Sequence, residues 1–124
     1  MDIDKDTVGE VWTEHHFRHD LPMKWDLSML MMENGIMKGF LIASNKNGKA
    51  HIHRLVIHKD FRNQGLGKIL VNVLKEKIDQ HNLGGITLKV ASQNKDAIRF
   101  YEQIGFQRIG LERGNYLMTQ PFIA

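Results

Sequence analysis

The spacing of apolar residues changes several times along the chain, and each change marks a new helix, strand or turn. Asn34-Gly35 is the pair typical of a two-residue hairpin turn, and Asn45 to Gly48 make a second turn. Short apolar runs flank both turns. The pattern therefore predicts three antiparallel strands in a meander: Leu27–Met32, Ile36–Ala43 and about Ala50–Ile57.

Helical spacing begins after the meander. A helix is predicted from Leu66 to about His81, with one apolar face formed by Leu66, Ile69, Leu70, Val73, Leu74 and Ile78. The strand Ile86–Val90 follows, and a helical connection makes it parallel to the strand before the helix. Asn94 caps a second helix that Gly105 ends, and a final hairpin joins Phe106–Leu111 to Tyr116–Thr119.

These elements predict an α+β fold, a mixed and mainly antiparallel central sheet flanked by helices. Thr7 and Glu10 form a possible capping box for a further helix at about Val8–Arg18. The chain has 124 residues, 42% hydrophobic and 25% charged, which suits one domain over residues 1–124.

Composition then narrows the chemistry. The absence of cysteine excludes disulfides, thiolate metal sites and a cysteine nucleophile. No apolar run approaches membrane-spanning length and the N-terminus is acidic, so we expect a cytoplasmic protein without a membrane partner. We see no nucleic-acid motif and expect no nucleic-acid partner.

Charge is uneven along the chain. Residues 1–48 carry 5 basic and 8 acidic side chains, a net of −3, whereas residues 49–124 carry 12 and 6, a net of +6. This difference is either scatter or a basic half for a polyphosphate cofactor beside an acidic half for a cationic amine.

The stretch from Arg62 to Gly67 lies where a strand passes into a helix. Its two glycines allow an anion to approach the backbone, and the N–H groups and dipole of the helix then face the negative charge. Glycines at such a junction can also be purely structural. The spacing alone therefore leaves a phosphate site and a tight turn as alternatives.

Two blocks together carry a family resemblance. Arg62, Gly65 and Gly67 match the pattern Arg/Gln-x-x-Gly-x-Gly/Ala, and a downstream block comprises Leu88-Lys89-Val90, Asn94, Ala97, Phe100-Tyr101 and Gly105-Phe106. From about Phe40 to Met118 the chain resembles the GNAT superfamily of acetyl-CoA-dependent N-acetyltransferases. Such domains usually begin with a strand, and only six residues precede Thr7 here, so we expect the first strand to be short or missing.

The resemblance implies a binding site for acetyl-CoA as cosubstrate. Backbone groups of Leu55, Val56 and Ile57 would bind the pantetheine arm and the acetyl carbonyl, although these residues also suit a buried strand. Asn94 could contact the cofactor as well as cap its helix. The pyrophosphate would be held by Arg62, Asn63, Gln64, Gly65, Leu66, Gly67 and Lys68, of which the two basic residues suit a solvated surface equally well.

Catalytic residues are implied in the same way. Tyr101 matches the position of the family's general acid, which protonates the leaving thiolate; the alternative is a packing tyrosine. His53 takes the place of a glutamate that serves many relatives as base, and a histidine has a suitable pKa of about 6.5. His51 shares its strand face, but no third ligand is evident and no metal is expected.

The resemblance thus implies direct transfer of acetyl to a primary amine, with a small-molecule amine ahead of a protein or peptide amine. A non-catalytic acyl-CoA-binding regulatory module is the alternative from another class. We also expect a homodimer, because the apolar strand Leu27–Met32 would lie at a sheet edge. Met1–Asp4 or the first helix could instead cover that edge within a monomer, and we take Met29 and Met31 as the test positions.

Overall fold

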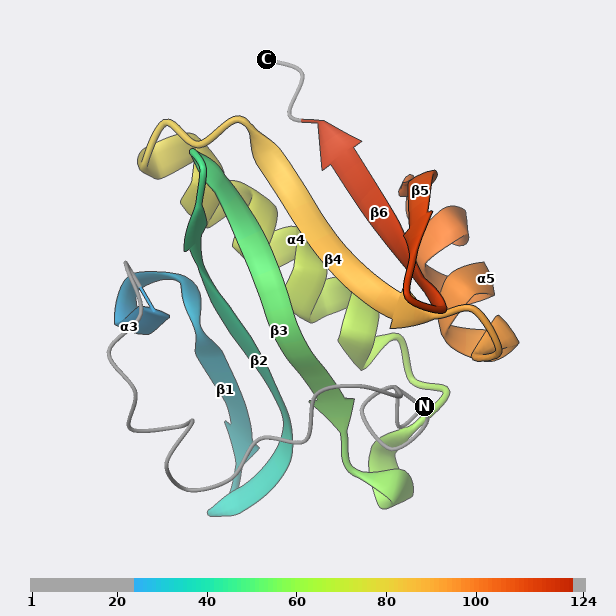
Figure 1. Cartoon of the computed structure of the whole chain (residues 1–124). Helices are drawn as coiled ribbons and strands as arrows, with labels where there is room; N and C mark the ends of the chain where they lie inside the picture. Colours follow the sequence, from blue (N-terminus) through green and yellow to red (C-terminus); the bar gives the residue numbers. More distant parts are fainter. Residues whose placement is uncertain (1–23, 122–124) are drawn as a thin grey trace.

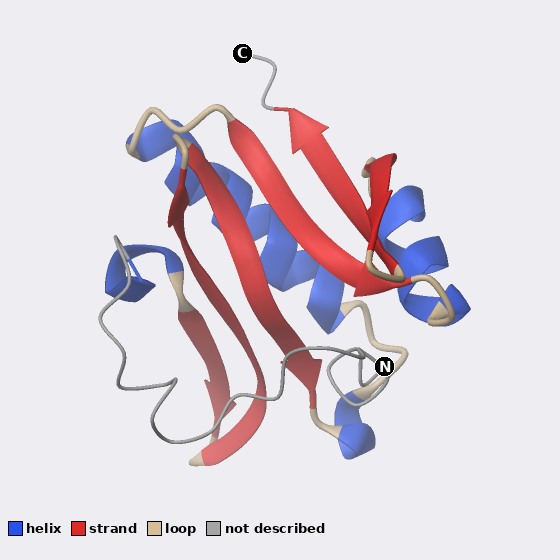
Figure 2. Cartoon of the chain, viewed as in Figure 1, coloured by secondary structure: helices blue, strands red, loops and turns tan. Residues whose placement is uncertain are grey.

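A six-stranded mixed sheet dominates the computed structural model, which describes residues 24–121 (Figures 1 and 2). Its strand order is β1-β2-β3-β4-β6-β5. The elements are α3 (Lys24–Leu27), β1 (Met29–Glu33), β2 (Ile36–Lys46), β3 (Lys49–Ile57), the 3-10 helix η1 (Lys59–Phe61), α4 (Leu66–Gln80), β4 (Gly85–Ala91), α5 (Lys95–Gln103), β5 (Gln107–Glu112) and β6 (Asn115–Pro121).

This arrangement confirms the predicted α+β class, the meander and the parallel pairing of β3 with β4. The first strand was misplaced by two residues. Leu27 ends α3 and is fully buried, and the strand begins at Met29. The Lys77 ammonium donates to the carbonyls of Asp26 and Ser28, which holds this corner against α4. The predictions for Val8–Arg18 and Met1–Asp4 lie outside the described residues.

The hairpin turns follow directly from their residues. Asn34 and Gly35 have φ of 53° and 77°, and Asn47 and Gly48 have φ of 56° and 81°. A type I′ turn requires positive φ at both central residues, which asparagine and glycine adopt at little cost. Antiparallel pairing of β1 with β2, β2 with β3 and β5 with β6 confirms the three predicted hairpins.

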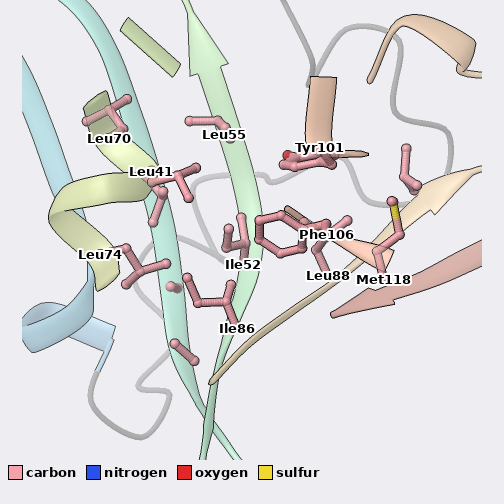
Figure 3. Close-up of a cluster of buried hydrophobic side chains, with 14 of the residues drawn as sticks. Leu41, Ile52, Leu55, Leu70, Leu74, Ile86, Leu88, Tyr101, Phe106 and Met118 are labelled. Atoms are coloured by element: carbon pink, nitrogen blue, oxygen red, sulfur yellow. The ribbon is translucent and has the colours of Figure 1, made fainter. Parts of the chain in front are cut away.

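One face of the sheet, which we call the helix face, packs against α4 and α5 (Figure 1). Figure 3 shows part of the resulting core, in which Leu70 and Leu74 of α4 meet apolar side chains of the sheet. The predicted face of α4 is partly wrong. Ile69 is 46% exposed and Val71 is fully buried, because the buried stripe of this helix runs through Gly67, Leu70, Val71, Leu74 and Ile78.

A bulge in β3 decides which residues point to the opposite side, which we call the outer face. Ala43 pairs with Ile52, but Ile42 pairs with Arg54, so His53 is an extra residue. A bulge of this kind turns two successive side chains to the same side. His53 and Arg54 therefore both lie on the outer face, while Ile52 before the bulge and Leu55 and Ile57 after it belong to the core.

The two parallel strands are side by side only at their start. β3 and β4 pair over three registers, the last being Ile52 with Leu88. Beyond that point β3 continues along β2 to Ile57, and β4 continues along β6 to Ala91. Figure 1 shows the two strands diverging toward their C-terminal ends.

The edges of the described sheet are β1 and β5. On β1, Leu30 and Met32 are 59% and 50% exposed, whereas Met29 and Met31 pack against the core. Our choice of Met29 and Met31 as edge test positions was therefore wrong, because alternation turns them inward. Across residues 24–121, no helix has the length and apolar content to cross a membrane.

Candidate active site

The loop from Arg62 to α4 has the features of an anion-binding site. Gly65 is the N-cap of α4, with φ of 77° and no side-chain capping bond, and the first turn carries no acidic residue. The first N–H groups of an α-helix have no partner within the helix and lie at the positive end of its dipole. Among the described residues, a Cβ added at Gly65 would meet nothing within 4 Å, so these residues leave the turn open.

Contacts on either side hold the loop in place. The Arg62 guanidinium donates through Nε to the Ile57 carbonyl at 3.3 Å. Gly67 is buried, and a Cβ there would lie 3.0 Å from Cζ of Phe100. The two glycines of the motif thus differ: Gly65 supplies the left-handed turn, and Gly67 lets α5 approach the start of α4.

The strand segment Leu55 to Ile57 lies beyond the divergence of β3 and β4. Leu55 and Ile57 are buried in the core, as strand packing predicts. Their backbone pairs with β2 on one side, but within the described sheet it has no strand partner on the β4 side. The same segment can therefore pack its side chains in the core and turn its backbone toward a pantetheine arm.

Asn94 is the predicted cap of α5, and this is confirmed. Its Oδ1 accepts a hydrogen bond from the Ala97 amide at 3.1 Å. The residue is 7% exposed, and its Nδ2 is buried without a hydrogen-bond partner among the described residues. A buried donor without a partner is costly, and a ligand acceptor would remove the cost.

Tyr101 lies in the core on the helix face (Figure 3). Its ring is edge-on to Phe100 and Phe106, with centroids 5.2 and 5.3 Å away. Burial raises the pKa of the Tyr101 phenol well above its usual range, so the group stays protonated at neutral pH. The packing role and the role of proton donor are therefore compatible at this residue.

His53 belongs to a polar row on the outer face. Its Nε2 is 2.7 Å from the Ser44 hydroxyl, and its ring is edge-on to His51 at 5.1 Å. His51 Nδ1 is in turn 2.8 Å from the Thr87 hydroxyl. Burial, followed by the charges of His53 and nearby lysines, lowers the pKa of His51 to about 3, so His51 is neutral near neutral pH.

Ser44 and Thr87 are further candidate site residues, and the sequence alone did not point to them. Both stand at outward positions of strands, which is a weak signal on its own. Only the strand register places Ser44 and Thr87 on either side of His51. Within the described residues, no three His, Cys, Asp or Glu side chains are grouped so that they could hold a metal ion.

The two candidate catalytic residues lie on opposite faces of the sheet. Tyr101 is part of the core on the helix face, and His53 is on the outer face with Ser44. A group that contacts both must lie where β3 and β4 have diverged, beyond the pair Ile52 and Leu88. That stretch also leads to the glycine loop, since β3 ends just before it.

Comparison with known proteins identifies the family. Residues 1–106 match the sequence model of the acetyltransferase (GNAT) family. The chain belongs to this family. It is an N-acetyltransferase, and its acetyl donor is acetyl-CoA. The open glycine loop and the uncapped start of α4 fit the phosphates of that donor.

Individual relatives have low sequence identity to this chain, but the matches cover most of it. The chain is 27% identical over 108 residues to the [ribosomal protein bS18]-alanine N-acetyltransferase of Escherichia coli K12, covering 87% of this chain and 72% of that enzyme. The structure of Ard1 from Thermoplasma volcanium superposes with a TM-score of 0.83 at 25% identity, covering 98% and 88% of the two chains.

A third protein is similar in fold. The PaiA N-acetyltransferase of Thermoplasma acidophilum, crystallised with coenzyme A, gives a TM-score of 0.74 at 20% identity. The match covers 77% of this chain and 60% of that one.

Proposed function

We propose that this protein transfers acetyl from acetyl-CoA directly to the α-amine at the N-terminus of a protein or peptide. The sequence alone put a small-molecule amine slightly ahead. The matched enzyme from Escherichia coli is named for an alanine of a ribosomal protein, and a second relative, 29% identical over 103 residues, is named N-alpha-acetyltransferase 30. These names support the protein amine, which was the alternative.

The observation that carries the mechanism is the placement of Tyr101 and His53 on opposite faces at the divergence of β3 and β4. Acetyl-CoA, when bound, supplies an acetyl thioester. In our proposal Tyr101 donates a proton to the departing sulfur from the helix face. His53 accepts the proton of the attacking amine from the outer face, directly or through water.

Cofactor binding would use the loop and its surroundings. Backbone N–H groups from Arg62 to Lys68 would hold the pyrophosphate, and the backbone of Leu55 to Ile57 would hold the pantetheine arm. The Asn94 Nδ2 is a suitable donor to an amide carbonyl of that arm, because it is buried and has no partner among the described residues.

The α-amine also suits the chemistry of the base. An α-amino group has a pKa of about 7.7 to 8.0, whereas a lysine side chain has a pKa of about 10.4. At pH 7.4 roughly a quarter of α-amines are neutral, against about one in a thousand lysine amines. An α-amine therefore needs less help from His53 before it attacks.

A transfer assay tests the proposal. Purified protein is given acetyl-CoA and three acceptors: a peptide with a free N-terminal alanine, the same peptide with a blocked N-terminus and one internal lysine, and a panel of polyamines and amino sugars. Mass spectrometry should find acetyl on the first peptide alone. Turnover of the small amines and not of the peptide would restore the small-molecule reading. Coenzyme A binding without turnover of any acceptor would place the acceptor outside all three classes tested.

A further inference from the structure

The outer face beside His53 carries positive charge. Lys89 directly follows Leu88 in β4, just as His53 directly follows its partner Ile52 in β3, so both stand at the point of divergence. Leu88 and Val90 are buried in the core, which turns the exposed Lys89 to the outer face with Thr87.

Two further cations lie on this face. Lys46 is exposed on β2, two residues beyond Ser44, and its charge together with that of Lys89 acts on buried His51. The half-buried Arg54 places its guanidinium over the Phe40 ring at 5.4 Å. Ion pairs among the described residues join Lys38 to Glu33, His58 to Asp60 and Arg108 to Glu102, and so involve neither Lys46 nor Lys89.

We infer that the outer face selects acceptors that carry negative charge beside the reacting amine, such as peptides with an acidic second residue, and that Lys46 and Lys89 are the selecting residues. This inference rests on the proposed function, which brings the acceptor to His53 from the outer face. Cations on one face attract an acidic segment and repel polyamines and lysine-rich peptides.

The same charges act on the amine itself. An ammonium beside fixed cations loses its proton more readily, because the positive field disfavours its charged form. The face therefore raises the neutral fraction of a bound α-amine. Lys89 is closest in register to His53 and should contribute most to both effects.

The test compares three peptides with free N-termini that differ only in the second residue: Glu, Gln or Lys. At low salt we expect kcat/KM to be about 3- to 10-fold higher for the Glu peptide than for the Lys peptide, shrinking at 0.5 M salt because exposed charges are screened. Lys89→Glu should flatten or reverse the order. Arg99→Glu makes the same change of charge on α5, on the helix side, and should leave the order as in the parent.

Binding supplies a readout that does not need turnover. Fluorescently labelled, N-acetylated forms of the three peptides are titrated with the parent and with both variants, and affinity should follow the order Glu, Gln, Lys in the parent. Equal or reversed orders in turnover and binding overturn the inference while leaving peptide acetylation intact. If no peptide is acetylated but the binding order holds, the proposed function fails and the charge selection stands.

Discussion

The two faces of the sheet are built by opposite rules. On the helix face, buried apolar side chains such as Leu74 and Ile86 form one continuous cluster. On the outer face, His51 and His53 are joined to hydroxyl groups, and lysines stand nearby. The first face stabilises the fold and holds one candidate proton donor, and the second holds the candidate base.

In our proposal, this difference between the faces lets one sheet serve two proton transfers. A donor needs to stay protonated, which burial in an apolar cluster favours, and a base needs polar partners and access for an amine. One face of a sheet cannot easily offer both apolar burial for the donor and polar, accessible surroundings for the base. The divergence of β3 and β4 is where groups from the two sides can reach the same bond.

The largest expected effect is on the helix face. Tyr101→Phe should lower turnover by roughly 10- to 1000-fold with coenzyme A affinity nearly unchanged, since only the phenolic proton is lost. Tyr116→Phe removes a hydroxyl from a half-buried tyrosine elsewhere and should have little effect. Steady-state kinetics and calorimetry measure both quantities. Equal turnover in Tyr101→Phe and the parent would leave Tyr101 with packing alone.

Between the faces, the glycine loop should respond to charge. Gly65→Asp places a carboxylate at the uncapped start of α4 and should weaken coenzyme A binding by about 10- to 100-fold, by calorimetry. Gly48 has φ of 81° and, like Gly65, no described residue within 4 Å of an added Cβ, but it lies in the β2–β3 turn. Gly48→Asp is therefore a matched control. Equal coenzyme A affinity in the two variants would argue against a phosphate-binding site at the glycine loop.

On the outer face, His53→Ala should remove the base. The parent's activity should fall on acidification as the base becomes protonated, which gives the pH–activity profile an acidic limb. His53→Ala should lack this acidic limb and retain about 1 to 10% of the parent's activity at neutral pH. His81→Ala changes an exposed histidine at the end of α4 and should keep the parental profile. An unaltered acidic limb in His53→Ala would assign the base to water or another group.

Buried His51 should make stability depend on pH. Its pKa is lowered to about 3 in the folded state, below the 6.5 of an unfolded histidine. The unfolded state thus binds an extra proton as pH falls from about 6.5 toward 3, and stability drops by at most about 1.4 kcal/mol per pH unit.

Denaturant unfolding at several pH values measures this slope. His51→Asn, which retains a polar partner for Thr87, should show a shallower slope than the parent, and His81→Asn should show the parental slope. A parental slope in His51→Asn would mean that other groups govern the acid response.

The smallest expected effect concerns assembly. We expect a homodimer through the β1 edge, where Leu30 and Met32 are exposed. Light scattering should detect it, and lysine at both positions should give a monomer of about 14.4 kDa. Lysine at Ile109 and Leu111, exposed on the opposite edge, is the control and should leave the dimer intact. A monomeric parent at high micromolar concentration would refute the expectation.

The sequence by itself determined the elements whose signals are local. Asn34-Gly35 specified a turn because few other residues accept positive φ at both positions. Asn94 specified the start of α5 through its own side chain. Glycines after an apolar strand marked the loop before α4. Each of these depends on residues within a few positions of one another, so one-dimensional reasoning was sufficient.

Only the tertiary structure decided which way the strand residues point and what they meet. The bulge at His53 and the inward turn of Met29 depend on pairing with β2, and a shift of one residue would send each side chain to the other face. The partners Ser44 and Thr87, and the opposite sides of His53 and Tyr101, follow from the same register. Register is set by contacts between residues far apart in the chain, which no local pattern encodes.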